Sequence, residues 1–353
     1  MRQSISMFFG RLAKLFGEEE LQEVVLTEPE PKEETGQELR QKAEEIDATP
    51  LIVDENNQNN KLDKEQTKTR RKKPKNGDIV TTDPRDIRDI MELMEVPMVA
   101  LSKNRTTPII YESLDGKAKV KISCHAPHYV ASIYDWDIIL FISSKLQETI
   151  NSKSDIPQRT LIIPRHELLK SIHKHDGKTN RKEIEASLSR LQLTGIETNI
   201  HNEDYRYRAG FSFLDSWRYT ERKDIKEFRI TLSEWLYEIT CHKGALLKVH
   251  PEYFKITSGL KRFLYRTARK HVGNQNEGWT FLVETLYEKS GSEQEFKKFK
   301  YKLKKAVENN DIPGYFLDWI DKGGSVSVRF INARKEIKKM LSEENDQPSL
   351  PFL

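Results

Sequence analysis

The sequence predicts an α+β protein with two winged-helix domains in tandem, preceded by a disordered acidic arm. In two places an apolar segment of helical length is followed by a short strand, two closely spaced helices and a pair of strands. In both places the last helix turns a polar or basic face away from its apolar stripe. In a helix-turn-helix the second helix enters the major groove, so this order of elements predicts a DNA-binding protein.

The predicted elements of the first copy are a helix over 135–151, a strand over 159–163, a helix over 164–173 and a last helix over 181–193. Pro164 starts its helix at a position where a missing N–H costs nothing. In the last helix Ile184, Leu188 and Leu191 share one face, which leaves the opposite face free for DNA. The runs 196–200 and 205–217 are predicted to form the wing around a polar tip at 201–204.

The candidate DNA contacts of the first copy are Lys178, Asn180, Lys182, Ser189 and Arg190. Glu185 lies among the outward residues, and a carboxylate opposes phosphate. Two interpretations of Glu185 stay open: an ordinary surface residue, or an acceptor for a cytosine amino group.

The second copy repeats the order with a helix over 258–271, a strand over 279–282, a helix over 283–289 and a last helix over 293–309 that Ser292 is expected to cap. The strands 315–320 and 325–331, joined by 321–324, form the predicted second wing. Five outward residues of the last helix are candidate DNA contacts: Lys297, Lys298, Tyr301, Lys304 and Lys305. A lysine face of this kind is also typical of a solvated surface, but here it lies on the second helix of the pair, the one that enters the major groove in a winged helix.

Charge is distributed unevenly along the chain. Residues 18–58 hold 14 acidic and 3 basic residues, a net charge of −11, whereas the whole chain carries +4. Such a segment buries too little apolar surface to fold, so residues 18–96 are expected to be a disordered linker, acidic and then basic from Lys68 to Lys75. The basic part is either a phosphate-binding arm or a solubilising linker. The expected domains are 1–17, an amphipathic helix; 97–222 and 223–342, the two winged helices; and 343–353, a flexible tail.

The two cysteines, Cys124 and Cys241, favour a reducing cytoplasm and form no disulfide framework. No apolar run is long enough to span a bilayer. The amphipathic segment 1–17 is expected to dock into a partner's groove or onto the body of the protein, with attachment to a membrane surface as the other interpretation.

Several runs resemble the plasmid replication initiator protein A family. They are Ala100 to Pro108 (ALSKNRTTP), Ile133 to Asp137 (IYDWD), Leu188 to Gln192 (LSRLQ), Glu197 to Ile200 (ETNI), Phe213 to Trp217 (FLDSW) and Gly259 to His271 (GLKRFLYRTARKH). The resemblance covers roughly residues 97–271. It implies a bacterial plasmid initiator that binds repeated sites in double-stranded origin DNA, helps to open the origin and recruits host replication proteins such as the initiator ATPase and the helicase. It also suggests a homodimer formed through the less basic first copy.

Within the run from Gly259, apolar residues recur at helical spacing, and five cations are expected to stay accessible and grip phosphates: Lys261, Arg262, Arg266, Arg269 and Lys270. The other interpretation is an exposed amphipathic helix without a ligand. At the C-terminus, Gln347, Leu350 and Phe352 resemble the peptide that binds the bacterial sliding clamp, against the alternative of a plain disordered end.

No enzymatic activity, cofactor or metal is expected. The Gly177-Lys178-Thr179 tripeptide lacks the upstream glycine of a phosphate-binding loop, because Ile172 stands there. Cys124, His125 and His128 lack a fourth ligand at zinc-finger spacing. The alternatives to an initiator are a winged-helix transcriptional repressor or partition adaptor and, as a third class, a nicking endonuclease.

Overall fold

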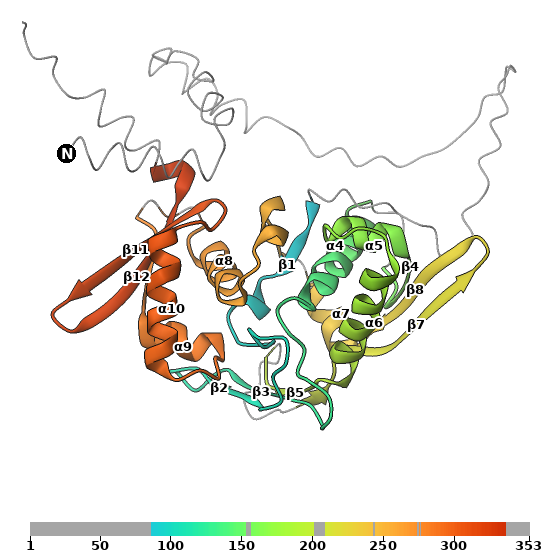
Figure 1. Cartoon of the computed structure of the whole chain (residues 1–353), viewed down its shortest axis with the longest axis horizontal. Coiled ribbons are helices and arrows are strands. Elements are labelled where there is room, and N and C mark those ends of the chain that lie inside the picture. Colours follow the sequence, from blue (N-terminus) through green and yellow to red (C-terminus); the bar gives the residue numbers. More distant parts are fainter. Residues whose placement is uncertain are drawn as a thin grey trace, which may run out of the picture. The chain divides into compact units, whose positions relative to one another are not determined.

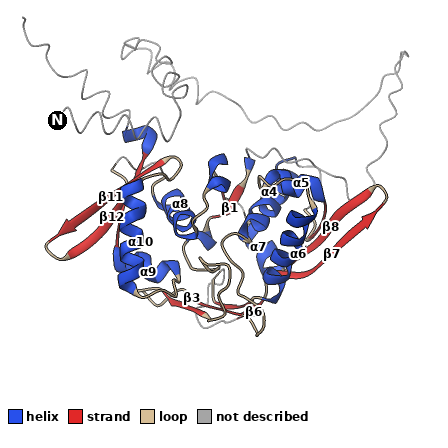
Figure 2. Cartoon of the chain, viewed as in Figure 1, coloured by secondary structure: helices blue, strands red, loops and turns tan. Residues whose placement is uncertain are grey.

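The computed structural model describes residues 86–152, 157–200, 209–242, 244–273, 275 and 277–336. The amphipathic segment 1–17, the linker up to residue 85, the predicted wing tip at 201–204 and the clamp-like tail lie outside these residues. Within them the protein is a mixture of helices and small antiparallel sheets (Figure 2).

The first module, residues 136–232, begins with the long helix α4 (Trp136–Ser152). It continues through β4 (Thr160–Pro164), α5 (Arg165–Ser171), α6 (Lys178–Leu193) and the hairpin strands β7 (Leu214–Arg222) and β8 (Ile225–Leu232). Its sheet has the strand order β4-β8-β7 (Figure 1). The helices lie near the predicted ranges, but α5 begins at Arg165, since Pro164 still belongs to β4, and α6 begins at Lys178, three residues before the predicted start. Ile184, Leu188 and Leu191 of α6 are all buried, as their helical spacing predicts.

The second module, residues 259–332, repeats this order. It consists of α8 (Gly259–His271), β10 (Trp279–Leu282), α9 (Val283–Ser290), α10 (Phe296–Asn309), β11 (Tyr315–Lys322) and β12 (Ser325–Asn332). The strand order β10-β12-β11 matches that of the first module. The prediction that Ser292 caps the last helix is wrong. The helix begins at Phe296, and the Ser292 hydroxyl instead accepts a hydrogen bond from the Gln294 N–H at 3.2 Å within the turn.

The predicted first wing is also wrong. Strand β5 (Gly195–Thr198) pairs with β6 (Ala209–Phe211), but both belong to another sheet, of order β2-β3-β5-β6, with β2 (Ile109–Glu112) and β3 (Lys119–Ser123). The Asn199 side chain stabilises the pairing of β5 with β3: it accepts a hydrogen bond from the Lys119 N–H at 2.9 Å and donates one to the Lys117 carbonyl at 2.6 Å. The hairpin that pairs with β4 is β7–β8, and the division expected between residues 222 and 223 falls in its turn.

Residues 86–96, which the sequence assigns to the disordered linker, are folded. They form β1 (Arg88–Ile90) and the short 3-10 helix η2 (Glu92–Met94), and β1 pairs with β9 (Leu246–Lys248). Ile87, Ile90 and Leu93 are fully buried, so this segment supplies apolar surface to the core. Two further short helices, α7 (Glu234–Cys241) and η3 (Pro251–Lys255), connect the modules.

Two buried ion pairs join α8 to the elements that precede it. Arg262 contacts Asp137 of α4 with 2.7 Å between Nη1 and Oδ1, and Arg266 contacts Asp89 of β1 with 2.6 Å between Nε and Oδ2. The indole of Trp136 also donates to Asp89, at 2.9 Å. The prediction that Arg262 and Arg266 are accessible is therefore wrong: their exposed fractions are 4% and 6%.

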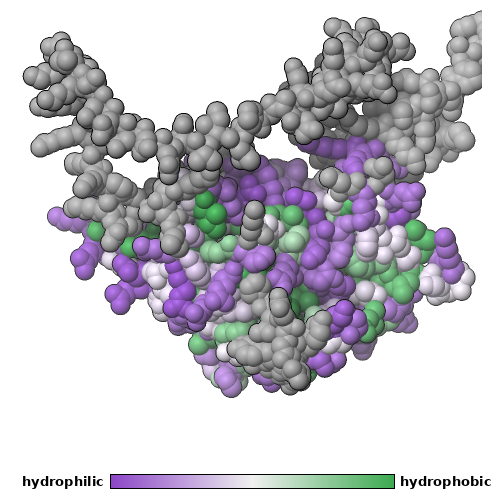
Figure 3. All heavy atoms as spheres, turned by 180° about the vertical axis from the view of Figure 1, so that it is seen from behind, coloured by the Kyte–Doolittle hydropathy of each residue, from purple (hydrophilic) through white to green (hydrophobic). Residues whose placement is uncertain are grey.

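The buried apolar side chains of both modules form one continuous cluster, from Ile87 to Phe330. Seen from behind, the surface is mostly hydrophilic with small scattered hydrophobic patches (Figure 3). Among the described residues no helix is long and apolar enough to cross a membrane.

Candidate nucleic-acid interface

The α10 helix presents the most basic face among the described elements. Phe299, Leu303, Ala306 and Val307 are buried along one side. The opposite side exposes five lysines and one aromatic ring: Lys297, Lys298, Lys302, Lys304, Lys305 and Tyr301. Lys298 lies 3.6 Å from Glu295, but no carboxylate among the described residues pairs with the other four lysines. Unpaired cations on a helix that follows a tight helix-helix turn suit a phosphate backbone.

Two of these lysines are oriented by aromatic rings. The Lys304 ammonium lies 6.0 Å from the ring centre of Trp319 on β11, and the Lys305 ammonium lies 5.5 Å from that of Tyr301. Such cation–π contacts hold a long side chain without neutralising its charge. The lysine face therefore keeps its positive charge while part of it is pre-ordered.

The corresponding helix of the first module, α6, is less basic. Lys178, Thr179, Lys182, Glu183 and Ala186 are exposed and line a shallow groove. Glu183 pairs with Lys174 at 2.5 Å, which holds the pKa of this carboxyl below its ordinary value, chiefly through the lysine hydrogen bond. Lys178 and Lys182 have no carboxylate partner among the described residues, so both predicted contacts remain available.

The other predicted residues of α6 are less available. Arg190 donates to both oxygens of the buried Asp135, with distances of 2.9 and 2.6 Å, which raises the pKa of its guanidinium. The Asn180 amide donates to the His175 carbonyl at 2.7 Å and so stabilises the turn before α6. Ser189 is half-buried. Glu185 lies 3.5 Å from Arg181, as expected of an ordinary surface residue.

The β7–β8 hairpin carries exposed cations that were not among the predicted DNA contacts. It exposes Arg218, Arg222, Lys223, Lys226 and Arg229 together with three acids, Asp215, Glu221 and Asp224, and Lys226 pairs with Glu221 at 4.0 Å. Arg218 and Arg229 are direct cross-strand partners, although like charges in that position destabilise a sheet. The signal that identifies this hairpin is the alternation of Phe228, Ile230 and Leu232, all buried, with polar residues.

The second hairpin, β11–β12, is closer to neutral. Its directly opposed residues Asp318 and Arg329 form an ion pair at 3.6 Å, and Asp321 and Lys322 are both exposed near the turn. The two modules therefore distribute positive charge differently. The first spreads a small excess over α6, with four basic and two acidic residues, and the β7–β8 hairpin, with five basic and four acidic residues; the second concentrates it on the helix.

The remaining cations of α8 are engaged within the protein. Lys261 pairs with Asp311 at 2.6 Å, Arg269 donates to the Lys248 carbonyl at 2.7 Å, and Lys270 donates to the Met91 carbonyl at 3.1 Å. Together with the buried Arg262 and Arg266, these contacts show that α8 mainly joins the parts of the protein. Its sequence pattern does not distinguish this role from phosphate binding.

The described residues contain no group of three histidine, cysteine or acidic side chains that could hold a metal ion. Cys124 donates its thiol to the His128 carbonyl, with 3.1 Å between Sγ and O. Burial raises the pKa of the Cys124 thiol, so this cysteine is poorly suited to nucleophilic chemistry.

Comparisons with known sequences identify replication proteins as relatives of this chain. Residues 88–317 match the family described as Replication initiator protein A. A "Putative replication protein" of Wigglesworthia glossinidia brevipalpis is 34% identical over 226 residues, which are 63% of this chain and 80% of that protein. Among solved structures, a selenomethionine crystal structure of domains 2 and 3 of RctB superposes with a TM-score of 0.51 at 13% identity. It covers 68% of this chain and 97% of the RctB chain, and it supports the fold alone.

Proposed function

Because the chain belongs to the Replication initiator protein A family, we propose that it initiates replication of a plasmid by binding repeated sites in origin DNA with two winged-helix modules. In each module the second helix of the close pair, α6 or α10, enters the major groove, and the hairpin of the three-stranded sheet lies along the adjacent backbone. The observation that carries the proposal is the lysine face of α10, whose cations other than Lys298 lack carboxylate partners among the described residues.

The different charge of the two modules suggests different roles on one DNA site. In the second module the helix supplies the phosphate contacts, through Lys297, Lys298, Lys304 and Lys305. In the first module the exposed cations of the β7–β8 hairpin share them with Lys178 and Lys182 of α6. Phosphate contacts position a protein on DNA, whereas contacts to base edges specify the sequence.

The decisive experiment is the salt dependence of binding to a duplex from the plasmid's own origin. Each neutralised phosphate contributes about 0.9 to the slope of log K against log salt concentration. Changing Lys297, Lys298, Lys304 and Lys305 to Ala should flatten the slope by about 3.6 if each neutralises one phosphate, while the circular dichroism spectrum stays unchanged. A quadruple variant with the slope of the parent chain contradicts the assignment.

A transcriptional repressor or partition adaptor with the same modules would pass that test. An initiator must also open the origin and support replication of a plasmid that carries its sites. Permanganate reactivity of unpaired thymines next to the bound sites, together with maintenance of a reporter plasmid, separates the two classes.

We propose that the initiator activity is non-enzymatic, needs no cofactor and takes place in the cytoplasm. Metal-dependent cleavage with a covalent tyrosine adduct would instead identify a nicking enzyme.

We also propose that the protein recruits the host initiator ATPase and helicase, and the sliding clamp through Gln347, Leu350 and Phe352. A short peptide with two apolar anchors suits a preformed groove. The test compares clamp binding by the full chain and by a variant with these three residues changed to Ala. Equal binding by both chains contradicts the role of the tail.

The less basic α6 favours the first module as the dimerising one, in competition with binding to DNA. Sedimentation of the full chain should therefore show dimers that dissociate when origin DNA is added. A sedimentation coefficient that does not change with protein concentration would contradict this assignment.

A further inference from the structure

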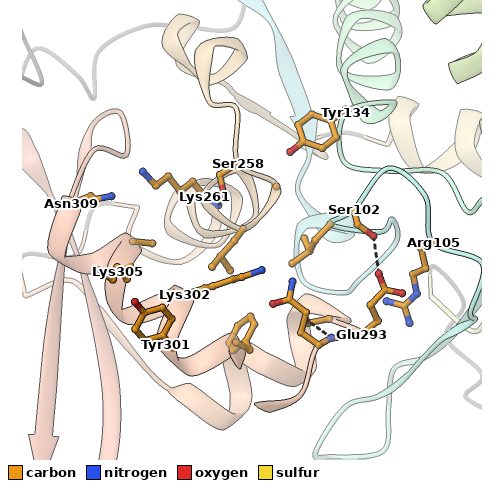
Figure 4. Close-up of a pocket in the computed structure, with 17 residues that line it drawn as sticks. Ser102, Arg105, Tyr134, Ser258, Lys261, Glu293, Tyr301, Lys302, Lys305 and Asn309 are labelled. Carbon is orange, nitrogen blue, oxygen red and sulfur yellow. Dashed lines mark hydrogen bonds between the residues drawn. The ribbon is translucent and has the colours of Figure 1, made fainter. Parts of the chain in front are cut away.

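A cavity of about 530 Å³ lies between the start of α8, one side of α10 and the loop that contains Leu101, Ser102 and Arg105 (Figure 4). Lys302 extends from α10 towards the loop of Ser102, whereas the Lys261 side chain is directed towards the side of Asn309 (Figure 4). The cavity borders one side of the lysine face of α10: Tyr301, Lys302 and Lys305 line it, and Lys297, Lys298 and Lys304 do not. Its volume is in the range of small-molecule sites, about 300–1,000 Å³.

The cavity has an excess of positive charge. Four cations line it, namely Lys261, Lys302, Lys305 and Arg105, with one acidic lining residue, Glu293. Lys261 pairs with Asp311 at 2.6 Å and Arg105 donates to backbone carbonyls, so Lys302 and Lys305 supply the excess charge. Glu293 is already held, since it accepts hydrogen bonds from Ser102 at 3.0 Å and Thr107 at 3.4 Å. Lys302 and Lys305 have no carboxylate partner among the described residues. Lysines that share a cavity repel one another, so an anionic ligand would relieve the repulsion.

The walls of the cavity are fixed before any ligand binds. A Cβ atom on Gly259 would lie 2.1 Å from the Leu101 carbonyl oxygen, so glycine is needed for α8 to approach the loop this closely. The Arg105 guanidinium, which is 7% exposed, donates to the carbonyls of Thr107, Pro108 and Gly291. These contacts join the loop to the turn before α10. Pre-formed walls reduce the ordering cost of binding.

The other half of the lining is apolar. Leu101 and Leu260 are half-buried there, with Phe299 and Ala306 behind them and the exposed ring of Tyr301 at the edge. A plain phosphate ion would leave this surface unused. A ligand with a flat apolar ring and several negative charges uses both halves, and a nucleoside polyphosphate has both features.

We propose that this cavity is a binding site for a nucleoside polyphosphate, with the phosphates at Lys302 and Lys305 and the base against Leu101 and Leu260. The Gln294 amide, which also lines the cavity, is suited to the polar edge of the base. Since Lys305 is also a proposed DNA contact, a bound nucleotide would alter the affinity of α10 for DNA. That regulatory consequence rests on the proposed function, but the binding itself does not.

The test is calorimetric titration of the full, nucleic-acid-free chain with ATP, inorganic tripolyphosphate and adenosine. ATP should bind saturably, tripolyphosphate more weakly and adenosine not measurably. Lys302→Gln combined with Lys305→Gln should weaken ATP binding about tenfold or more, because each lysine supplies a charge-assisted hydrogen bond. Lys297→Gln combined with Lys298→Gln is the matched control, with the same helix and charge change outside the cavity, and should bind ATP like the parent.

Three outcomes would overturn the proposal. ATP does not bind saturably, tripolyphosphate binds as tightly as ATP, or the control variant loses as much affinity as the cavity variant. The measurement contains no DNA, so a failure of the DNA-binding model leaves its result unaffected.

Discussion

At the scale of single residues, the buried Arg262–Asp137 ion pair attaches α8 to α4, so that Arg262 is not available to bind phosphate. Both side chains are almost inaccessible, and burial raises the pKa of the Asp137 carboxyl while the charge of Arg262 opposes this. The sequence could not predict the pairing because Asp137 is 125 positions from Arg262, and Asp89 is 177 positions from Arg266. Helical periodicity places Arg262 and Arg266 on α8 but does not show that distant acids cover them.

Removing one partner of a buried ion pair leaves a desolvated charge, which typically costs about 3–5 kcal/mol. Arg262→Met should therefore lower the free energy of unfolding in urea by an amount of that order. Lys261→Met is the control at the adjacent position. It breaks a partly exposed pair with Asp311 and should cost about 1 kcal/mol or less. Similar losses in both variants would contradict the structural role of Arg262.

Glu95 gives the protein a defined dependence on pH. Burial raises the pKa of this carboxyl, but hydrogen bonds and charge from His271 and Lys289 outweigh burial and lower it to about 2, from an ordinary value of 4.5. As the pH falls from 4.5 to 2, the unfolded chain binds a proton before the folded chain does, so stability is lost across this window.

Glu95→Gln should remove that part of the acid sensitivity. The carboxyl is about a third exposed, and solvent screening reduces the effect to about 1–2 kcal/mol. Urea unfolding at pH 5 and pH 3 should show a smaller difference in the variant than in the parent chain. Identical differences in both chains would show that Glu95 is not responsible.

At the scale of elements, the sequence predicted the order of helices and strands in the second copy, but it missed α7, began α10 three residues too early and misplaced the first hairpin. Two strand-like stretches follow α6, and local pattern alone does not decide which of them pairs with β4. In the structure β5 pairs with β3 instead of β4, and Asn199 accepts a hydrogen bond from the Lys119 N–H next to this pairing. The hairpin residues that could contact DNA therefore differ from those of the predicted wing, because the β7–β8 hairpin extends beyond the stretch expected to form that wing.

The two hairpins should therefore contribute unequally to DNA binding. Changing Arg218, Arg222, Lys223 and Arg229 of β7–β8 to Ala should flatten the salt slope by about 3.6, if each neutralises one phosphate at about 0.9. The matched change on β11–β12, Lys322→Ala with Arg329→Ala, should flatten it by less than 1, because Asp318 already pairs with Arg329. Equal effects per charge on the two hairpins would contradict this distribution.

At the scale of the whole molecule, the continuous apolar cluster and the pairs along α8 predict that the two modules unfold together. The amide hydrogens of α4 and α8 should converge on one opening free energy in denaturant-dependent hydrogen exchange. Arg266→Met, which breaks the contact with Asp89, should separate the two values. Distinct values in the parent chain would show independent modules. Sequence periodicity identified the repeated units but gave no information on this coupling.

The close contact of Gly259 with the Leu101 carbonyl has a genetic consequence. Any side chain at position 259 collides with rigid backbone, so alanine, the smallest replacement, already forces α8 and the loop apart. We expect Gly259→Ala to fold at low temperature and to unfold at a lower temperature than the parent chain. If the proposed function holds, this substitution is a heat-sensitive allele, and cells that carry it lose the replicon when the culture is warmed.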